Sequence, residues 1–353
     1  MNKKIIIAIT AVVAVVLAII IFFVGFYYVN LKPVKENDNS KVTFVVNGGT
    51  SIKALIDNLE DAGLIKNRYV GYFYVKFNNV NTIQAGEYTL SKAMSVKDIL
   101  ERISNGEANV HALTIRFIEG KRLTRYVSDI ASKFNYTEDE IMDVLNDPKF
   151  IDECINKYWF ITNDVKNSKL YYPLEGYLFA DTYTIYENAS IKDIIFTMLD
   201  TMGAKLEPYK DQISSSGYSV HEVLTLASII ELEGVSKDDR KLISQVFKNR
   251  LAINMTLGSD VTTYYAAKKE MIQSLTQAEL DDCNPYNTRG KCVPGLPVGP
   301  IATPSLSSID AVFNPTENEY LYFVASKSGK VYYGKTSLEH SRNIYNINAG
   351  LVD

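Results

Sequence analysis

The segment Ser219–Arg250, SVHEVLTLASIIELEGVSKDDRKLISQVFKNR, predicts two helices joined by a tight turn. Ser219 and Glu222 have the spacing of a capping box, in which each side chain satisfies a free backbone N–H of the first helical turn. Ser236 and Asp239 open the second helix in the same way. This segment is therefore predicted to be a helical hairpin.

Two acids stand near the end of the first helix. At about 100° per residue, Glu231 falls on the apolar stripe of Val220, Leu224 and Ala227. Glu233 lies on another face, because residues two apart point away from each other on a helix. An apolar environment and the negative end of the helix dipole both disfavour a charged carboxylate. We therefore expect Glu231 to keep its proton near neutral pH, as a general acid must.

The end of this helix leaves a second interpretation open. Gly234 follows the two acids and suits the left-handed backbone position that often ends a helix. A glutamate in a last helical turn is commonly only solvated, which would leave Glu231 without a chemical role. The residue pattern by itself is compatible with both interpretations.

Composition limits the class of protein. The chain has 353 residues, of which 46% are hydrophobic, enough for a membrane segment and about two domains. The net charge is −4 and no basic run follows the N-terminus, so nucleic acid is not an expected partner. The three cysteines and three histidines lack metal-site spacing, so we predict no metal and no cofactor. Cys283 and Cys292 could bridge the loop between them, but two separate thiols are slightly favoured.

The N-terminus predicts a membrane anchor. Lys3 and Lys4 precede an apolar run, Ile5–Val29, which is long enough to cross roughly 30 Å of hydrocarbon. We predict that residues 1–29 form an uncleaved transmembrane helix with a cytoplasmic N-terminus, which places the rest outside the cytoplasm at the cell membrane. A cleaved signal peptide is the alternative. Residues 30–40 are polar and predict a short linker.

The remaining chain predicts an α+β fold in two parts. Residues 41–109 form a small α+β module with the order strand, helix, helix, strand, helix, over residues 41–46, 51–62, 67–77, 86–90 and 95–104. Residues 110–353 form a larger mixed α+β domain, which closes with a hairpin over residues 320–333.

Several segments together resemble the membrane-anchored endolytic murein transglycosylases. The segments are TIRFIEG (114–120), LEGYLFADTY (174–183), ASIIELE (227–233), FKNRL (247–251), LGSDVTTYYA (257–266), YNTR (286–289), GLPVGPIATPS (295–305) and YLYFVA (320–325). In that family the central run is typically ASIVEKE, and its first Glu, which matches Glu231, is the catalytic acid. The resemblance covers nearly the whole chain after the apolar run. It also implies that the module of residues 41–109 is LysM-like.

The resemblance implies a substrate cleft lined by these motifs. The residues predicted to bind substrate are Glu233, Asp260, Thr262, Tyr286, Asn287, Thr288 and Glu175. The amide of Asn287 suits recognition of an N-acetyl group. This chain departs from the family pattern at Val261, where the family usually has Pro, and at Leu232, where it has Lys.

The activity implied by the resemblance is lytic cleavage of peptidoglycan. Such an enzyme cleaves the MurNAc–GlcNAc bond of nascent glycan strands at the membrane, leaves 1,6-anhydroMurNAc ends and terminates strand elongation. The implied partners are peptidoglycan strands and peptidoglycan synthases. One alternative is a hydrolytic muramidase that pairs Glu231 with Asp260, Asp181 or Glu175. The other is a non-catalytic glycan-binding scaffold of cell-wall synthesis.

Overall fold

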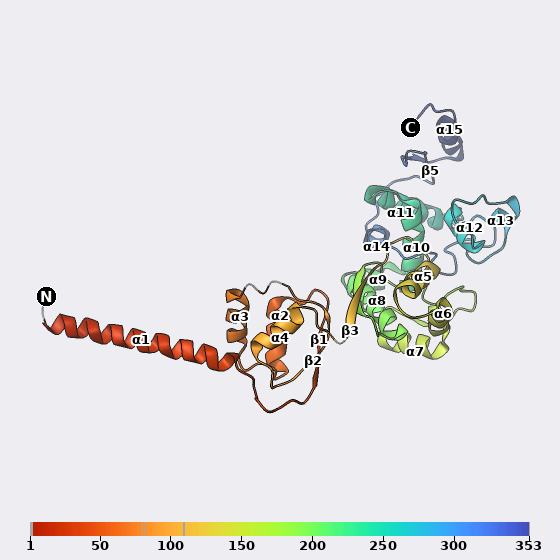
Figure 1. Ribbon diagram of the computed structural model, residues 1–353. Coiled ribbons are helices and arrows are strands. Elements are labelled where there is room, and N and C mark those ends of the chain that lie inside the picture. Colours follow the sequence, from red (N-terminus) through yellow and green to blue (C-terminus); the bar gives the residue numbers. More distant parts are fainter. Residues whose placement is uncertain (1–2, 79, 81, 109, 353) are drawn as a thin grey trace. The chain divides into compact units, whose positions relative to one another are not determined.

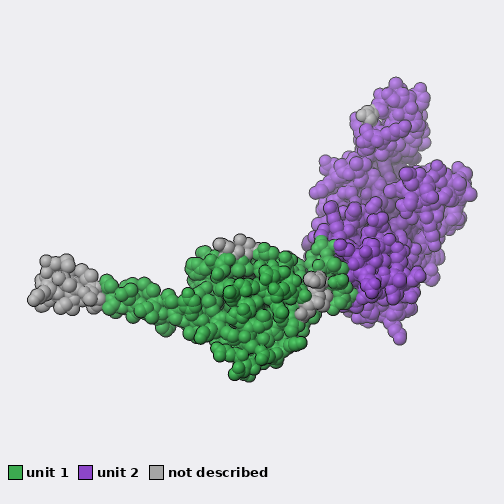
Figure 2. Space-filling model, viewed as in Figure 1, with its two compact units in different colours: residues 1–114, 183–189 green, residues 115–182, 190–353 purple. Residues whose placement is uncertain are grey.

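The structure is a computed structural model that describes residues 3–78, 80, 82–108 and 110–352. The chain divides into two compact units, coloured separately in Figure 2. The first unit comprises residues 1–114 and 183–189, and the second comprises residues 115–182 and 190–353. A short segment of the first unit thus lies, in sequence, inside the second.

The first unit begins with the apolar helix α1 (Lys3–Leu31). Within its last 20 residues, Val12–Leu31, an 18-residue stretch has a mean hydropathy of 2.9, and the length and composition of the helix suffice to cross a membrane. The segment predicted as a linker is bonded to the module that follows. The N–H of Lys35 donates to the carbonyl of Lys92 at 2.9 Å, and the N–H of Ala93 donates to the carbonyl of Asp38 at 3.1 Å.

The module of the first unit has the predicted order of elements. They are β1 (Val42–Val46), α2 (Ile52–Asp61), α3 (Arg68–Phe77), β2 (Gly86–Leu90) and α4 (Val96–Ser104). β1 and β2 pair antiparallel, and β3 (Val110–Arg116) and β4 (Thr182–Tyr186) complete a sheet in the order β1-β2-β3-β4 (Figure 1). Buried residues of α2 and α4, such as Ile56, Leu59 and Ile99, form the core against this sheet. The order of elements is confirmed, and the LysM-like character stays a prediction.

The second unit is mainly helical (Figure 1). Its elements are α5 (Leu123–Lys133), α6 (Glu138–Asn146), α7 (Pro148–Lys157), the short 3-10 turns η1 (Asn163–Lys166) and η2 (Glu207–Tyr209), α8 (Ile191–Leu206), α9 (Lys210–Ser216), α10 (Val220–Glu233), α11 (Lys237–Ala252), α12 (Asp260–Ala266), α13 (Gln277–Asp281), α14 (Leu306–Phe313), the antiparallel hairpin β5 (Tyr322–Ala325) and β6 (Val331–Gly334), and α15 (Ser337–Asn348). The sequence patterns do not indicate α7, α9, α12 or α13. Pro148 starts α7, because proline at the first position of a helix gives up no hydrogen bond.

The helical hairpin α10–α11 is confirmed, with a capping box at Ser219 and another at Ser236. The single apolar stripe predicted for α10 is wrong, because the helix is buried all round from Val223 to Ile230. α11, α12 and α14 all pack against it. A helix enclosed on several sides needs no polar face except where it reaches a cavity.

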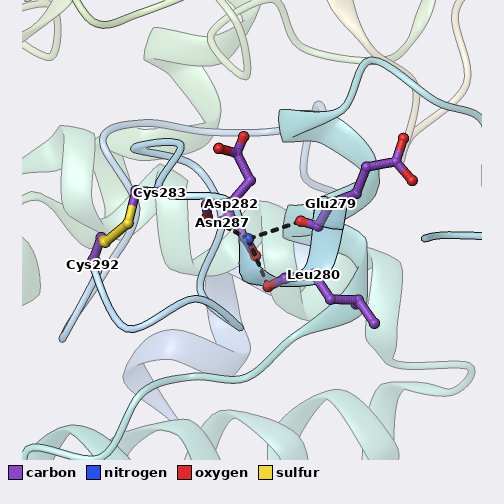
Figure 3. Close-up of a disulfide and its surroundings, with 6 residues drawn as sticks. All are labelled: Glu279, Leu280, Asp282, Cys283, Asn287 and Cys292. Atoms are coloured by element: carbon purple, nitrogen blue, oxygen red, sulfur yellow. Dashed lines mark hydrogen bonds between the residues drawn. A yellow bond between two sulfur atoms is a disulfide. The ribbon is translucent and has the colours of Figure 1, made fainter. Parts of the chain in front are cut away.

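Cys283 and Cys292 form a disulfide in the loop that follows α13, with their Cα atoms 5.3 Å apart (Figure 3). The preference for two separate thiols is therefore wrong. The fold of the intervening loop brings the two Cα atoms within the range that a disulfide can span, which the spacing of the residues in the sequence does not reveal.

Candidate active site

The carboxylate of Glu231 lies at the end of α10 and contacts both α11 and α14. Nη2 of Arg240, on α11, donates to Oε1 at 2.7 Å. Oε2 accepts from the backbone N–H of Ser305 at 2.9 Å and from the hydroxyls of Ser305 at 2.5 Å and Ser308 at 2.6 Å. Four donors therefore hold the two oxygens of one carboxylate.

These surroundings differ from the apolar environment expected for Glu231. Its side chain is only 7% exposed, but it is ion-paired with Arg240, which is 17% exposed. The N-terminus of α14 adds a backbone N–H and the positive end of a helix dipole. Donors of this kind complement a charged carboxylate. The sequence could not show this, because α14 lies more than seventy residues further along the chain.

Gly234 allows Arg240 to reach Glu231. The left-handed conformation predicted for Gly234 is wrong, since its φ of −90° and ψ of 120° are extended. A Cβ at this position would lie 2.4 Å from Cγ of Arg240. Glycine is therefore needed for space, because the arginine side chain passes directly over the end of α10.

The loop after β3 runs beside the same carboxylate. The N–H of Gly120 donates to the carbonyl of Thr303 at 2.8 Å, and the N–H of Thr303 donates to the carbonyl of Lys121 at 2.9 Å. Gly120 has a φ of +70°, and a Cβ there would lie 3.7 Å from Cγ of Glu231. Glu119, the residue before Gly120, is exposed and lines the same hollow as Glu231.

A cleft of about 680 Å³ opens beside Glu231. Its walls carry charges of both signs and several hydroxyl groups, on the side chains of Glu119, Tyr209, Glu231, Lys237, Asp238, Arg240, Lys241, Ser305, Ser307 and Asp310. A second hollow of about 350 Å³ shares Glu119 and Leu306 with the cleft and extends to Asp181. The two hollows are therefore neighbours that share part of one wall.

Comparison with known proteins shows the family. Residues 44–346 match the YceG-like family. The chain belongs to the YceG-like family. It is 36% identical over 314 residues to an endolytic murein transglycosylase of Bacillus subtilis strain 168, which covers 88% of this chain and 86% of that protein. The resemblance inferred from the sequence motifs is thereby confirmed.

Two further relatives agree with this assignment. An endolytic murein transglycosylase of Streptococcus pneumoniae D39 is 36% identical over 343 residues, covering 91% of this chain and 61% of the longer pneumococcal protein. The crystal structure of a yceG-like protein from Listeria monocytogenes superposes with a TM-score of 0.62 at 36% identity. That match covers 86% of this chain and 99% of the Listeria chain.

Within the YceG-like domain, Glu233 has a different environment from Glu231 and does not line the cleft. The hydroxyl of Ser259 donates to its Oε1 at 2.5 Å. Burial, with a smaller contribution from the nearby Asp260, raises the pKa of Glu233 to about 7. The two acids of α10 therefore face different surroundings, as the helical spacing predicts.

Asn287 is fully buried, and its amide is occupied within the protein. Nδ2 donates to the carbonyls of Glu279, Leu280 and Asp282 (Figure 3). Oδ1 accepts from the hydroxyl of Thr263 at 2.7 Å. The predicted contact with an N-acetyl group thus has no support in the geometry. Asn287 instead holds the disulfide loop against α12 and α13.

The neighbouring predicted residues share this structural role. Thr262, Tyr286 and Thr288 are fully buried, and the hydroxyls of Thr262 and Thr288 lie 2.8 Å apart. Asp260 is exposed, but it is paired with Arg289 and does not line the cleft. These residues therefore shape the loop near the site, and the structure does not bring them to Glu231.

Glu175 is also buried, with only 1% of its surface exposed. Its Oε1 accepts from the N–H of Leu123 at 2.8 Å, and its Oε2 accepts from the hydroxyl of Tyr265 at 2.9 Å. Burial raises the pKa of Glu175 to about 7. It joins the start of α5 to α12, so a direct contact with substrate is excluded in this conformation.

The residues that contact Glu231 are not predicted by the sequence. Arg240, Ser305 and Ser308 contact Glu231 directly, and Glu119 stands beside it. Some signals were present, because Ser305 ends the GLPVGPIATPS segment and Glu119 lies within TIRFIEG. Neither segment shows by itself that it approaches α10.

Proposed function

We propose that this chain is an endolytic murein transglycosylase that uses Glu231 as both general acid and general base. The observation that carries this proposal is one carboxylate, held by four donors, at the wall of an open polar cleft. Of the second acids considered for a muramidase, Glu175 is buried and Asp260 lies outside the cleft. Asp181, the third of these acids, lines the hollow beside the cleft, and Glu119 and Asp310 line the cleft itself, so the products of the reaction decide between one acid and two.

The reaction needs no water. Glu231 donates a proton to the oxygen that bridges MurNAc and GlcNAc, and the bond from C1 of MurNAc to that oxygen breaks. The C6 hydroxyl of the same MurNAc attacks C1, forms the new C1–O6 bond and returns its proton to the Glu231 carboxylate. The products are a 1,6-anhydroMurNAc end and a free GlcNAc hydroxyl, and Glu231 regains its starting state.

The contacts of Glu231 indicate which oxygen carries the proton. A guanidinium has only donors, so Arg240 cannot accept a proton carried by Oε1. Oε2 faces the hydroxyls of Ser305 and Ser308, and either hydroxyl can turn to accept a proton. We therefore place the acidic proton on Oε2, with Arg240 holding Oε1.

We further propose that α1 anchors the protein in the cell membrane with its N-terminus in the cytoplasm. Lys3 and Lys4 precede the apolar run, which favours this orientation. The Cys283–Cys292 disulfide supports an oxidising, extracytoplasmic location for the second unit. An anchored enzyme would meet nascent glycan strands where they emerge, beside the peptidoglycan synthases proposed as its partners.

Digestion of purified peptidoglycan in ¹⁸O-labelled water tests the reaction. We expect unlabelled products with 1,6-anhydroMurNAc ends, because the sugar supplies the nucleophile. The Glu231→Gln variant should yield neither anhydro nor reducing ends. Labelled reducing ends as the main product would replace this proposal with a muramidase, and Glu119 and Asp310 would become its candidate second acids. Glycan binding without any cleavage by the wild type would favour the scaffold.

A further inference from the structure

Helix α3 has an aromatic face that the module does not use. Tyr69, Phe73 and Phe77 stand four residues apart on one side of the helix and are 66%, 54% and 71% exposed. The opposite side, with Gly71 and Val75, is buried in the first unit. Large aromatic side chains in this arrangement mark an interaction surface rather than ordinary surface variation.

This face lies next to the exit of α1. An apolar groove of about 620 Å³ separates the two helices and is lined by Phe23, Val24, Phe26, Tyr27, Tyr28, Tyr69, Val70, Phe73 and Phe77. We call the exposed residues Tyr69, Phe73 and Phe77 the α3 aromatic face. Among the residues that the structure describes, the groove wall has no charged or amide side chain, which a site for sugar hydroxyls would be expected to provide.

The end of α1 is packed onto the module and does not hang from it on a free linker. Leu31 packs against the core of the first unit. Nζ of Lys66, one residue before the N-cap of α3, donates to the carbonyl of Val29 at 3.3 Å. If α1 crosses a bilayer, the α3 aromatic face is therefore held at the surface of that bilayer.

We infer that the α3 aromatic face lies in the interfacial layer of the membrane and that lipid fills the groove beside α1. This inference rests on the proposed membrane anchoring by α1. Aromatic side chains favour the boundary between acyl chains and headgroups, and the exposed aromatic residues Phe26 and Tyr28 stand at the same end of α1 as the α3 aromatic face. Lys66 and Lys76, both exposed, flank the face with charges that headgroups can solvate. The module is thus seated on the membrane and cannot swing freely about its anchor.

Tryptophan fluorescence of the full chain in vesicles tests this inference. Trp159 is the single tryptophan, so a Trp159→Phe background allows one probe to be placed at a time. The probe variants are Phe73→Trp on the α3 aromatic face, Leu17→Trp in α1, and Lys97→Trp at an exposed position of α4 whose side chain is 62% exposed. Each is reconstituted in phosphatidylcholine vesicles with and without lipid brominated near the start of the acyl chains.

We expect strong quenching by brominated lipid for Phe73→Trp, at least several-fold greater than for Lys97→Trp. Quenching of Leu17→Trp without quenching of Phe73→Trp would overturn the inference and leave the anchor intact. Equal quenching at Lys97 would also overturn it, because the module would then lie on the vesicle without preference for α3. Absence of quenching at Leu17 would instead show that the proposed anchor is wrong. If the Phe73→Trp probe is shielded from water in a way that depends on protein concentration, and not on brominated lipid, the α3 aromatic face would be assigned to a second copy of the chain.

Discussion

Nη2 of Arg240 donates to Oε1 of Glu231 at 2.7 Å across the turn between α10 and α11. The same guanidinium donates from Nη1 to the hydroxyl of Ser307 at 2.7 Å. Arg240 therefore bridges the acid on α10 to the first turn of α14, where the other donors to Glu231 originate. The bridge ties Oε1 to α11, while Oε2 faces the hydroxyls of Ser305 and Ser308.

Removing this bridge should destabilise the fold as well as the site. Arg240→Met leaves a largely buried carboxylate without its cation, and breaking such a pair costs roughly 3 kcal/mol of the free energy of unfolding. Lys241→Met is the matched control, because Lys241 pairs with Asp310 on the same cleft wall at greater exposure, where a pair contributes at most about 1 kcal/mol. Denaturant unfolding of both variants checks the prediction, and equal losses would contradict it.

A methyl group at Gly234 should disturb the site without straining the backbone. The extended conformation of Gly234 is open to alanine, but the new Cβ would lie 2.4 Å from Cγ of Arg240. We expect Gly234→Ala to displace Arg240 and to cost about 1–3 kcal/mol, the usual range for overpacking. Gly295→Ala is the control, since nothing lies within 4 Å of its Cβ position. Turnover and unfolding free energy are the measurements, and indistinguishable variants would refute the steric role of Gly234.

The two acids of α10 should differ sharply in their contribution to turnover. Glu231→Gln keeps the shape of the side chain but cannot transfer a proton, so we expect a loss of at least ~10²-fold. Glu233→Gln should cost much less, because Glu233 bonds to Ser259 outside the cleft. The rate at which each variant forms products from purified peptidoglycan is the measurement, and circular dichroism confirms that each variant is folded. Similar losses in the two variants would argue against a mechanism with one acid.

Glu175 should make stability depend on pH. Burial raises its folded-state pKa to about 7, whereas an unfolded glutamate titrates near roughly 4.3. The folded state therefore binds the extra proton between these values. The contribution of Glu175 is fully present below about 4.3 and is lost as the pH rises through about 7. As the pH rises from about 4.3 to about 7, the free energy of unfolding should fall less steeply for Glu175→Gln than for the wild type. An unchanged slope would contradict the assignment.

Glu279 provides a control of opposite sign for the same pH series. Its hydrogen bond with Lys269 lowers the pKa of Glu279 to about 2. Its contribution is therefore present above roughly 4.3 and is lost as the pH falls through about 2. Glu279→Gln should change the pH dependence of stability only on that acidic side.

Local signals in the sequence were sufficient to predict many of the helices and strands of this protein. The capping residues Ser219 and Ser236 placed both helices of the central hairpin, and the order of elements in the first unit followed from hydrophobic periodicity. Glu231 was singled out by the resemblance to a known family and not by its place on the helix, which left two interpretations open. The apolar run at the N-terminus, in contrast, was as readable as the helices. These features depend on interactions between residues a few positions apart, which any stretch of sequence displays directly.

The surroundings of the acid were decided by tertiary structure. Ser305 and Ser308 contact Glu231 although they lie more than seventy residues further along the chain. Asn287 and Glu175 are buried and form hydrogen bonds with residues of α12. The sequence does not distinguish a polar residue that binds a ligand from one that forms hydrogen bonds with buried backbone groups. Only packing determines which of them face a cavity, because each side chain's exposure depends on elements far away in the chain.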